Sequence, residues 1–166
     1  YRLSPDFKTD VGFVRRVDEQ RIVSTIGYRF WPETTVTNWG PSVTYVRNWS
    51  YADVLEDENL SVSLNTTFRN NISANVSVGQ DMERFQGIKF DKSSVRFFGR
   101  VSTSRKFSIG GFFRYGDEVR YIENPFLGRG GGGGLFATVR PVSRFQSQIN
   151  LNTSRLIDPR NDDELV

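Results

Sequence analysis

Apolar and polar residues alternate one by one along most of this chain, and this period of two constrains the fold more than any other feature. The clearest stretch is Leu60 to Arg69. One of its faces would carry Leu60, Val62, Leu64, Thr66 and Phe68, and the other Ser61, Ser63, Asn65, Thr67 and Arg69. Successive side chains of a β-strand point to opposite faces, so this pattern predicts a strand with one apolar face. Almost no segment shows a helical period of 3.6 residues. The sequence therefore predicts an all-β fold.

The alternation recurs in runs that would pair as hairpins. After Asn70-Asn71, a turn dipeptide, Ile72, Ala74, Val76 and Val78 fall on one face. Similar runs cover 11–17, 22–30, 44–50, 107–115 and 145–156. In two of them an Arg shares the apolar face, Arg15 in the first and Arg47 in the third. We expect both near a rim, or else a β-bulge that shifts the register there. The sequence predicts about nine strands.

The connections between these runs carry a second signal. Short turns are predicted at 31–35, 69–72, 104–106 and 140–144, and long charged or Gly-rich connections at 52–59, 81–94 and 116–134. This alternation is typical of an antiparallel up-and-down barrel with one short-turn rim and one long-loop rim. Aromatic residues near the short-turn rim resemble an interfacial girdle: Phe30, Trp31, Phe68, Phe107 and Phe145.

The composition of the two faces favours a transmembrane β-barrel segment. The polar face is built from Ser, Asn, Gln, Gly and a few Arg, which suits a hydrated lumen, and the opposite face of the clearest strands has no charge. The lipid-facing candidates are Leu60, Val62, Leu64, Ile72, Val76, Val78, Ile149 and Leu151. The lumen-lining candidates are Arg29, Arg69, Arg114, Asn65, Asn75, Gln148 and Asn150. A hydrogen-bonded ladder that stiffens the wall is an equally good interpretation of the second set.

Residues 1–166 form one β-barrel region in this interpretation. Single-chain bacterial barrels have an even number of strands, and the ninth strand would leave 158–164 as a loop with no returning strand. We therefore expect an incomplete barrel, a fragment of a larger outer-membrane barrel.

The composition argues against several chemistries. The 166 residues include no Cys and no His, so disulfides, Cys-ligated zinc and His-based catalysis are excluded, and we expect no enzyme activity, metal or cofactor. The net charge of +3 is spread along the chain, which does not indicate nucleic-acid binding. The Gly-rich run 128–134 lacks the context of a phosphate loop, and the acidic clusters 56–58 and 162–164 lack the spacing of a calcium loop. We interpret all three as loops.

Two segments resemble a known family. Residues 10–18 (DVGFVRRVD) and 27–32 (GYRFWP) are similar to the C-terminal barrel of a bacterial family of unknown function. Its members are large outer-membrane proteins whose N-terminal region resembles a family-9 carbohydrate-binding module. The resemblance is densest over 6–50 and looser to 166. It implies a location in the bacterial outer membrane and further strands beyond the position of Val166, and it implies no reaction.

These observations lead to one expected function and two alternatives. We expect an integral outer-membrane segment that serves as anchor or passage for a larger, carbohydrate-associated protein. Its expected partners are outer-membrane lipid, a carbohydrate or small polar solute, and other outer-membrane or periplasmic proteins. The first alternative is a structural or assembly subunit that conducts nothing. The second is a soluble ligand-binding β-barrel, which alternation alone does not exclude.

Overall fold

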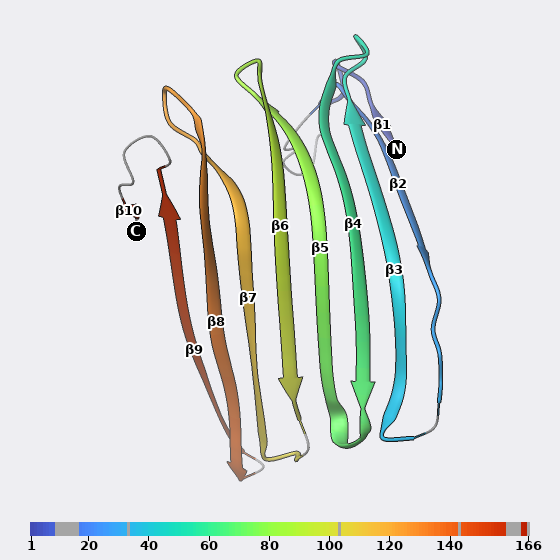
Figure 1. Cartoon of the computed structure of the whole chain (residues 1–166), viewed down its shortest axis with the longest axis vertical. Coiled ribbons are helices and arrows are strands. Elements are labelled where there is room, and N and C mark those ends of the chain that lie inside the picture. Colours follow the sequence, from blue (N-terminus) through green and yellow to red (C-terminus); the bar gives the residue numbers. More distant parts are fainter. Residues whose placement is uncertain (9–16, 33, 103, 143, 159–163, 166) are drawn as a thin grey trace.

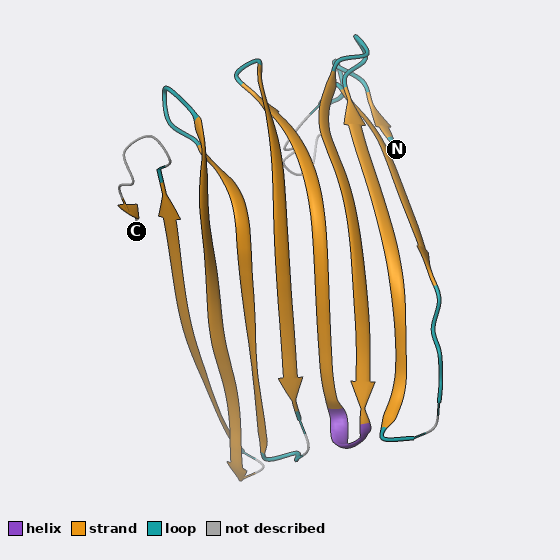
Figure 2. Cartoon of the chain, in the orientation of Figure 1, coloured by secondary structure: helices purple, strands orange, loops and turns teal. Residues whose placement is uncertain are grey.

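The chain forms one antiparallel sheet in which every strand pairs with the next along the sequence (Figures 1 and 2). The computed structural model describes residues 1–8, 17–32, 34–102, 104–142, 144–158 and 164–165. Its strands are β1 (Arg2–Leu3), β2 (Glu19–Gly27), β3 (Val36–Trp49), β4 (Leu55–Phe68), β5 (Ile72–Phe85), β6 (Ile88–Val101), β7 (Phe107–Arg120), β8 (Phe126–Val142), β9 (Phe145–Ile157) and β10 (Glu164–Leu165). Within the described residues the one helical segment is a 3₁₀ turn, η1 (Arg69–Asn71).

The predicted all-β, up-and-down architecture is confirmed. The eight strands from β2 to β9 are long, and β1 and β10 are two-residue strands at the two sides of the sheet. The strands pair in order from β1 to β10, and within the described residues β1 does not pair with β10. The sheet is therefore open, as an incomplete barrel would be. The predicted strand 11–17 lies almost wholly outside the described residues.

The four predicted short turns lie at one end of the sheet, which we call the turn edge, and the opposite end is the charged edge (Figure 1). The three long connections predicted at the charged edge are wrong. Strand β4 already begins at Leu55, β8 begins at Phe126, and β5 and β6 are separated by Gln86 and Gly87 alone. Both of these turn residues have positive φ, as a tight hairpin turn requires. The charged segments were mistaken for loops because they continue the strands with ion pairs in place of apolar alternation.

The Gly-rich run 128–134 is a central strand segment, not a loop. It lies in β8 and pairs with β7 on one side and β9 on the other. A Cβ added at Gly130 would lie 2.2 Å from the carbonyl oxygen of Arg155, and one at Gly131 would lie 2.4 Å from that of Arg114. The glycines thus allow the neighbouring backbones to approach more closely than side chains permit.

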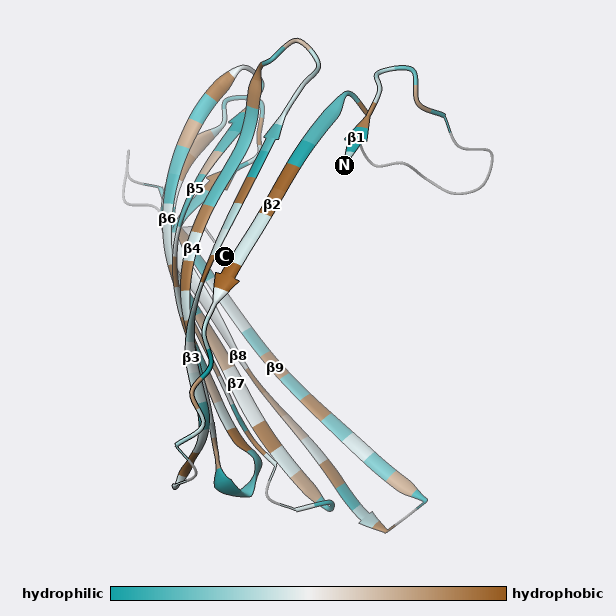
Figure 3. Ribbon diagram, turned by 90° about the vertical axis from the view of Figure 1, so that its right-hand side faces the viewer, coloured by the Kyte–Doolittle hydropathy of each residue, from teal (hydrophilic) through white to brown (hydrophobic). Residues whose placement is uncertain are grey.

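The sheet is curved along its strands (Figure 3) and staggered across them. The row of paired residues that starts at Phe30 and Trp39, beside the first turn, reaches Leu151 on β9. The last pair before the β8–β9 turn is Val142 and Phe145, six residues farther along the strand than Leu151. The turn end of the sheet is thus shifted along the strands by six residues, at roughly 3.3 Å per residue, across the six interstrand spacings from β3 to β9, each roughly 4.8 Å. This shift corresponds to a strand tilt of about 35°. Closed barrels have tilts of this size.

The sheet has no second layer in the described part of the chain. The buried apolar side chains are Met82, Phe90, Val119 and Phe126, all toward the charged edge, and no described large side chain is below 2% exposure. The long strands are therefore held mainly by backbone hydrogen bonds and cross-strand pairs, and one apolar face is left uncovered.

We predict that Gly130→Ala destabilises the sheet, whereas Gly79→Ala does not. The new methyl group at residue 130 would collide with the Arg155 carbonyl, and overpacking of this kind costs roughly 1–3 kcal/mol. At Gly79 the nearest atom to a new Cβ is 3.6 Å away. The measurement is the free energy of unfolding of both variants in urea. Equal stability of the two variants would contradict the close packing of β8 against β9.

Candidate functional site

The strand register collects the apolar residues on one surface. One row of paired residues contains Ile26, Val43, Val62, Val78 and Val95, drawn from five successive strands. Because residues directly opposite each other in a sheet point to the same side, these rows define an apolar face. From β4 to β9 its members are Leu60, Val62, Leu64, Thr66, Phe68, Ile72, Ala74, Val76, Val78, Val95, Phe97, Gly99, Val101, Phe107, Ile109, Gly111, Phe113, Tyr115, Gly131, Gly133, Leu135, Ala137, Val139, Ser147, Ile149, Leu151 and Thr153.

None of these residues is charged, and we call the zone that they form the apolar band. On the same face, the band is followed toward the charged edge by the first charged residue of each strand: Arg47, Glu58, Arg84, Asp91, Asp117, Arg129 and Arg155. Arg47 thus lies beyond the band, opposite Ile22 and Glu58, near the rim where the sequence predicted it. The apolar face therefore has a sharp boundary at its charged end.

All eight lipid-facing candidates lie on the apolar face. Seven of them are between 44% and 64% exposed, and Ile72 is partly buried. On β4 the serines between them are less exposed than Leu60, Val62 and Leu64, so the apolar side chains are the more open ones. Nothing in the described part of the chain covers this face. Whether it contacts lipid stays a prediction.

The opposite face carries a ladder of hydrogen bonds between uncharged polar side chains. Asn75 donates from Nδ2 to Oδ1 of Asn65 at 2.8 Å, and the Ser42 and Ser63 hydroxyls lie 2.9 Å apart. The Thr25 and Thr44 hydroxyls are 3.1 Å apart. This polar face links β2 to β5 by side chains as well as by backbone, in the way that a stiffened wall requires.

The structure places five of the seven lumen candidates on the polar face: Asn65, Asn75, Arg114, Gln148 and Asn150. Arg29 follows the end of β2, and its Cα lies near Gly40 of β3. Arg69 is not a strand residue but belongs to the turn η1. The sequence extended the strand one residue too far here, because Asn70 and Asn71 take the positive φ values that close the hairpin. A role in a lumen stays a prediction for all seven.

An aromatic group on the polar face was missed by the sequence analysis. Phe98 stacks on Phe136 with ring centroids 5.9 Å apart, and Phe112 is paired with Phe98 across β6 and β7. The Phe136 ring covers Gly110, where an added Cβ would lie 2.3 Å from Cζ. The sequence signal was the alternation that places Gly110 and Phe112 on the same face of their strand, which is also the face of Phe98. The polar face is therefore lined in part by phenyl rings.

Aromatic residues also gather at the turn edge, where the sequence predicted them. Phe30 and Trp39 stack with centroids 4.4 Å apart, and Tyr28 meets Phe30 edge-on at 4.5 Å. Phe68, Phe107 and Phe145 are terminal residues of their strands at the same edge, and Trp31 is 63% exposed.

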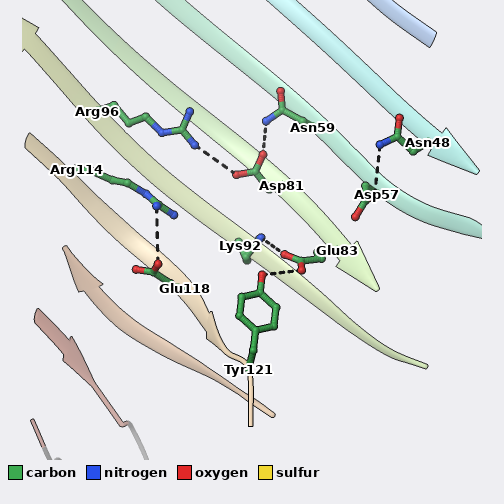
Figure 4. Close-up of polar contacts among 10 residues, drawn as sticks. All are labelled: Asn48, Asp57, Asn59, Asp81, Glu83, Lys92, Arg96, Arg114, Glu118 and Tyr121. Atoms are coloured by element: carbon green, nitrogen blue, oxygen red, sulfur yellow. Dashed lines mark hydrogen bonds and ion pairs between the residues drawn. The ribbon is translucent and has the colours of Figure 1, made fainter. Parts of the chain in front are cut away.

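Ion pairs and hydrogen bonds connect the strands toward the charged edge (Figure 4). Asp81 accepts a hydrogen bond from Asn59 and lies 3.9 Å from Arg96. Glu83 pairs with Lys92 on β6, and the Tyr121 hydroxyl donates to its Oε1 at 2.7 Å. These contacts explain why a sequence so rich in charge remains in strands here.

The Glu83 cluster shifts two titrations in opposite directions. Burial tends to raise the pKa of Glu83, but the hydrogen bonds from Lys92 and Tyr121 outweigh it and leave the pKa below its usual value. Partial burial of the Tyr121 hydroxyl, together with its hydrogen bond to Glu83, raises the pKa of Tyr121 to about 12, although 55% of the residue is exposed. Both shifts favour the state with a charged Glu83 and a neutral phenol.

The described side chains offer no metal-binding group of three or more acidic residues. In the same part of the chain, no helix is long and apolar enough to cross a membrane. Glu56, Asp57 and Glu58, predicted as a solvated loop, lie in β4, where Asp57 accepts from Asn48 at 3.3 Å.

Comparisons with protein-family models, curated proteins and solved structures give no match. The resemblance of 6–50 to an outer-membrane barrel family thus stays a prediction, and the functional argument depends on the two faces of the sheet.

We predict that Glu83→Gln lowers the pKa of Tyr121 from about 12 without returning it to 10.0, because the partial burial remains. The folded state binds the phenol proton more tightly than an unfolded chain, so stability contributed by Tyr121 is present below pH 10 and lost as the pH rises toward 12. The measurement is an absorbance titration, with Tyr121→Phe subtracted to isolate this phenol. Asp91→Asn, at an exposed carboxylate paired with Lys89, is the control. An unchanged Tyr121 titration in Glu83→Gln would contradict the contact.

Proposed function

We propose that this chain is a segment of the wall of a β-barrel in the outer membrane of a Gram-negative bacterium. The observation that carries the proposal is the apolar band: an exposed, uncharged surface that crosses β4 to β9 and ends at charged residues on one side. In this arrangement the apolar face contacts lipid and the polar face lines the lumen.

The length of the band supports a bilayer as its environment. On β4 it extends from Leu60 to Phe68, on β7 from Phe107 to Tyr115, and on β8 from Gly131 to Val139. The band is nine residues long on these strands and seven on β5, β6 and β9. These lengths approach the roughly 9–11 residues that tilted transmembrane strands need to cross the hydrocarbon core. The strands themselves are longer, and their additional residues toward the charged edge include the first charged residue of each strand on this face.

The stagger of the turns supports the same proposal. A strand tilt of about 35° lies at the lower end of the range for outer-membrane barrels, roughly 35–45°. The aromatic residues at the turn edge, among them Phe30, Trp31 and Trp39, take the position of an interfacial girdle.

A soluble barrel or sandwich is a weaker candidate. Such folds bury their apolar face against a second sheet or inside the barrel, so the apolar side chains are little exposed to solvent. Here Leu60, Val62 and Leu64 are more exposed than the serines that alternate with them. A soluble protein would need a further layer over the whole band.

The polar face suits either passage or anchoring. Its hydrogen-bonded Asn and Ser pairs offer polar groups to small polar or sugar-like solutes, and the Phe98, Phe112 and Phe136 rings offer an apolar surface of the kind on which sugar rings stack. An anchor would need only the apolar face. Conductance of the full-length protein in a planar bilayer separates the two, since an anchor with a plugged lumen gives no steady current.

The proposal is tested by fractionating cells that express the full-length protein and comparing its gel mobility with and without boiling. We expect recovery in the outer membrane with a heat-dependent shift, the behaviour of a closed barrel. A matched pair of variants sharpens the test. Leu64→Arg places a charge at the middle of the band, where the cost is roughly 2–4 kcal/mol, and should abolish the shifted form.

Ser61→Arg is the control on the same strand. Ser61 faces the polar side opposite Gly79, which leaves room for the longer side chain, so the shifted form should persist. Recovery of the protein in the soluble fraction, or equal tolerance of both arginines, would overturn the proposal.

A further inference from the structure

Charge is segregated along the strands. Every described acidic residue of β2 to β9 lies in the half of the sheet toward the charged edge. The described charged residues at the turn edge are all cationic: Arg29, Arg69, Arg100, Arg105, Lys106, Arg140 and Arg144. Crowded cations without carboxylates repel one another, and a bound anion relieves that repulsion.

Four of these cations line one cavity of about 800 Å³: Arg100, Arg105, Lys106 and Arg140. Arg100 lies on β6, Arg105 and Lys106 lie in the turn between β6 and β7, and Arg140 lies on β8. The cavity thus draws its charge from three neighbouring segments, and no described carboxylate lines it.

Backbone and side-chain hydrogen bonds hold this group in place. The Arg140 N–H donates to the Lys106 carbonyl at 2.6 Å, and the Lys106 N–H donates to the Ser104 hydroxyl at 3.0 Å. Arg140 also donates from Nε to Gln146 at 2.7 Å, which orients its guanidinium and leaves the terminal nitrogens for another acceptor. Arg100, Arg105 and Lys106 are exposed.

Hydroxyl groups complete the lining, from Ser102, Ser104, Ser108 and Thr138. Guanidinium forks match the oxygen spacing of phosphate, and hydroxyls supply further donors to the same oxygens. The cavity is far larger than a bare ion, since a water molecule occupies about 30 Å³. Its size therefore fits a phosphate group attached to a larger molecule.

We propose that this cavity at the turn edge is a binding site for a phosphate group. The cavity adjoins the apolar band only at Phe107, and its charged and hydroxyl groups lie outside the band. The site needs no lipid around the band, so it is independent of the proposed barrel. Two sources share the chemistry, a free phosphate compound and the headgroup of a phospholipid, and the experiment separates them.

The test uses the full-length protein in nonionic detergent micelles and three probes measured by calorimetry. The probes are inorganic phosphate, a short-chain phosphatidic acid and the matching diacylglycerol, which lacks the phosphate. The variant R100Q/R105Q removes two guanidinium groups from the cavity. Arg144→Gln removes the same type of charge from the same edge, at a residue that does not line the cavity.

We expect binding of a phosphate probe that weakens by about tenfold for each guanidinium removed and by less than about twofold in Arg144→Gln. Binding of inorganic phosphate assigns the site to free phosphate compounds; binding of phosphatidic acid but not of inorganic phosphate or diacylglycerol assigns it to a lipid headgroup. If R100Q/R105Q fails to fold by circular dichroism, Lys106→Gln in the exposed turn replaces it. No binding of either phosphate probe, or equal weakening by Arg144→Gln, overturns the proposal.

Discussion

The register of the backbone ladder is the constraint on which every other feature of this sheet depends. Side chains alternate between the faces with a period of two, so a slip by one residue would exchange the apolar and polar faces. The pairing of Val62 with Val78 on the apolar face and the pairing of Asn65 with Asn75 on the polar face stabilise the same register. The described chain has no second layer to correct a slip. The short turns and the cross-strand polar pairs must therefore fix the pairing.

The same register sorts charge along the strand as well as across it. Uncharged residues fill the apolar band, mixed ion pairs such as Glu83 with Lys92 occupy the charged edge, and cations occupy the turn edge. Because each strand repeats this order in alternating direction, the edges are properties of the whole sheet. The proposed lipid contact and the proposed phosphate site use different parts of this one arrangement.

Much of the fold could be predicted from the sequence, because the alternation in 60–69 and 72–79 indicates two strands, the face on which each residue lies and the hairpin that joins the strands. The prediction was wrong where a strand lacks alternation. Strand β8 carries glycines on both faces over 128–134, and the charged end of β5 replaces apolar residues by partners of Lys92 and Arg96. The cavity at the turn edge was not predicted, because it joins residues from β6, a turn and β8 that no local pattern relates.

The environment of the apolar face is tested most directly by labels placed one at a time from residue 60 to residue 68. Residues 1–166 include no Cys, so once any Cys elsewhere in the full-length protein is replaced, each single-Cys variant carries one nitroxide label. In the full-length protein in membranes, labels at Leu60, Val62 and Leu64 should relax with oxygen, which concentrates in lipid, and resist a water-soluble nickel chelate. Labels at Ser61 and Ser63 should show the reverse. A series without this alternation, or with the even positions open to the chelate, would contradict a membrane-embedded wall.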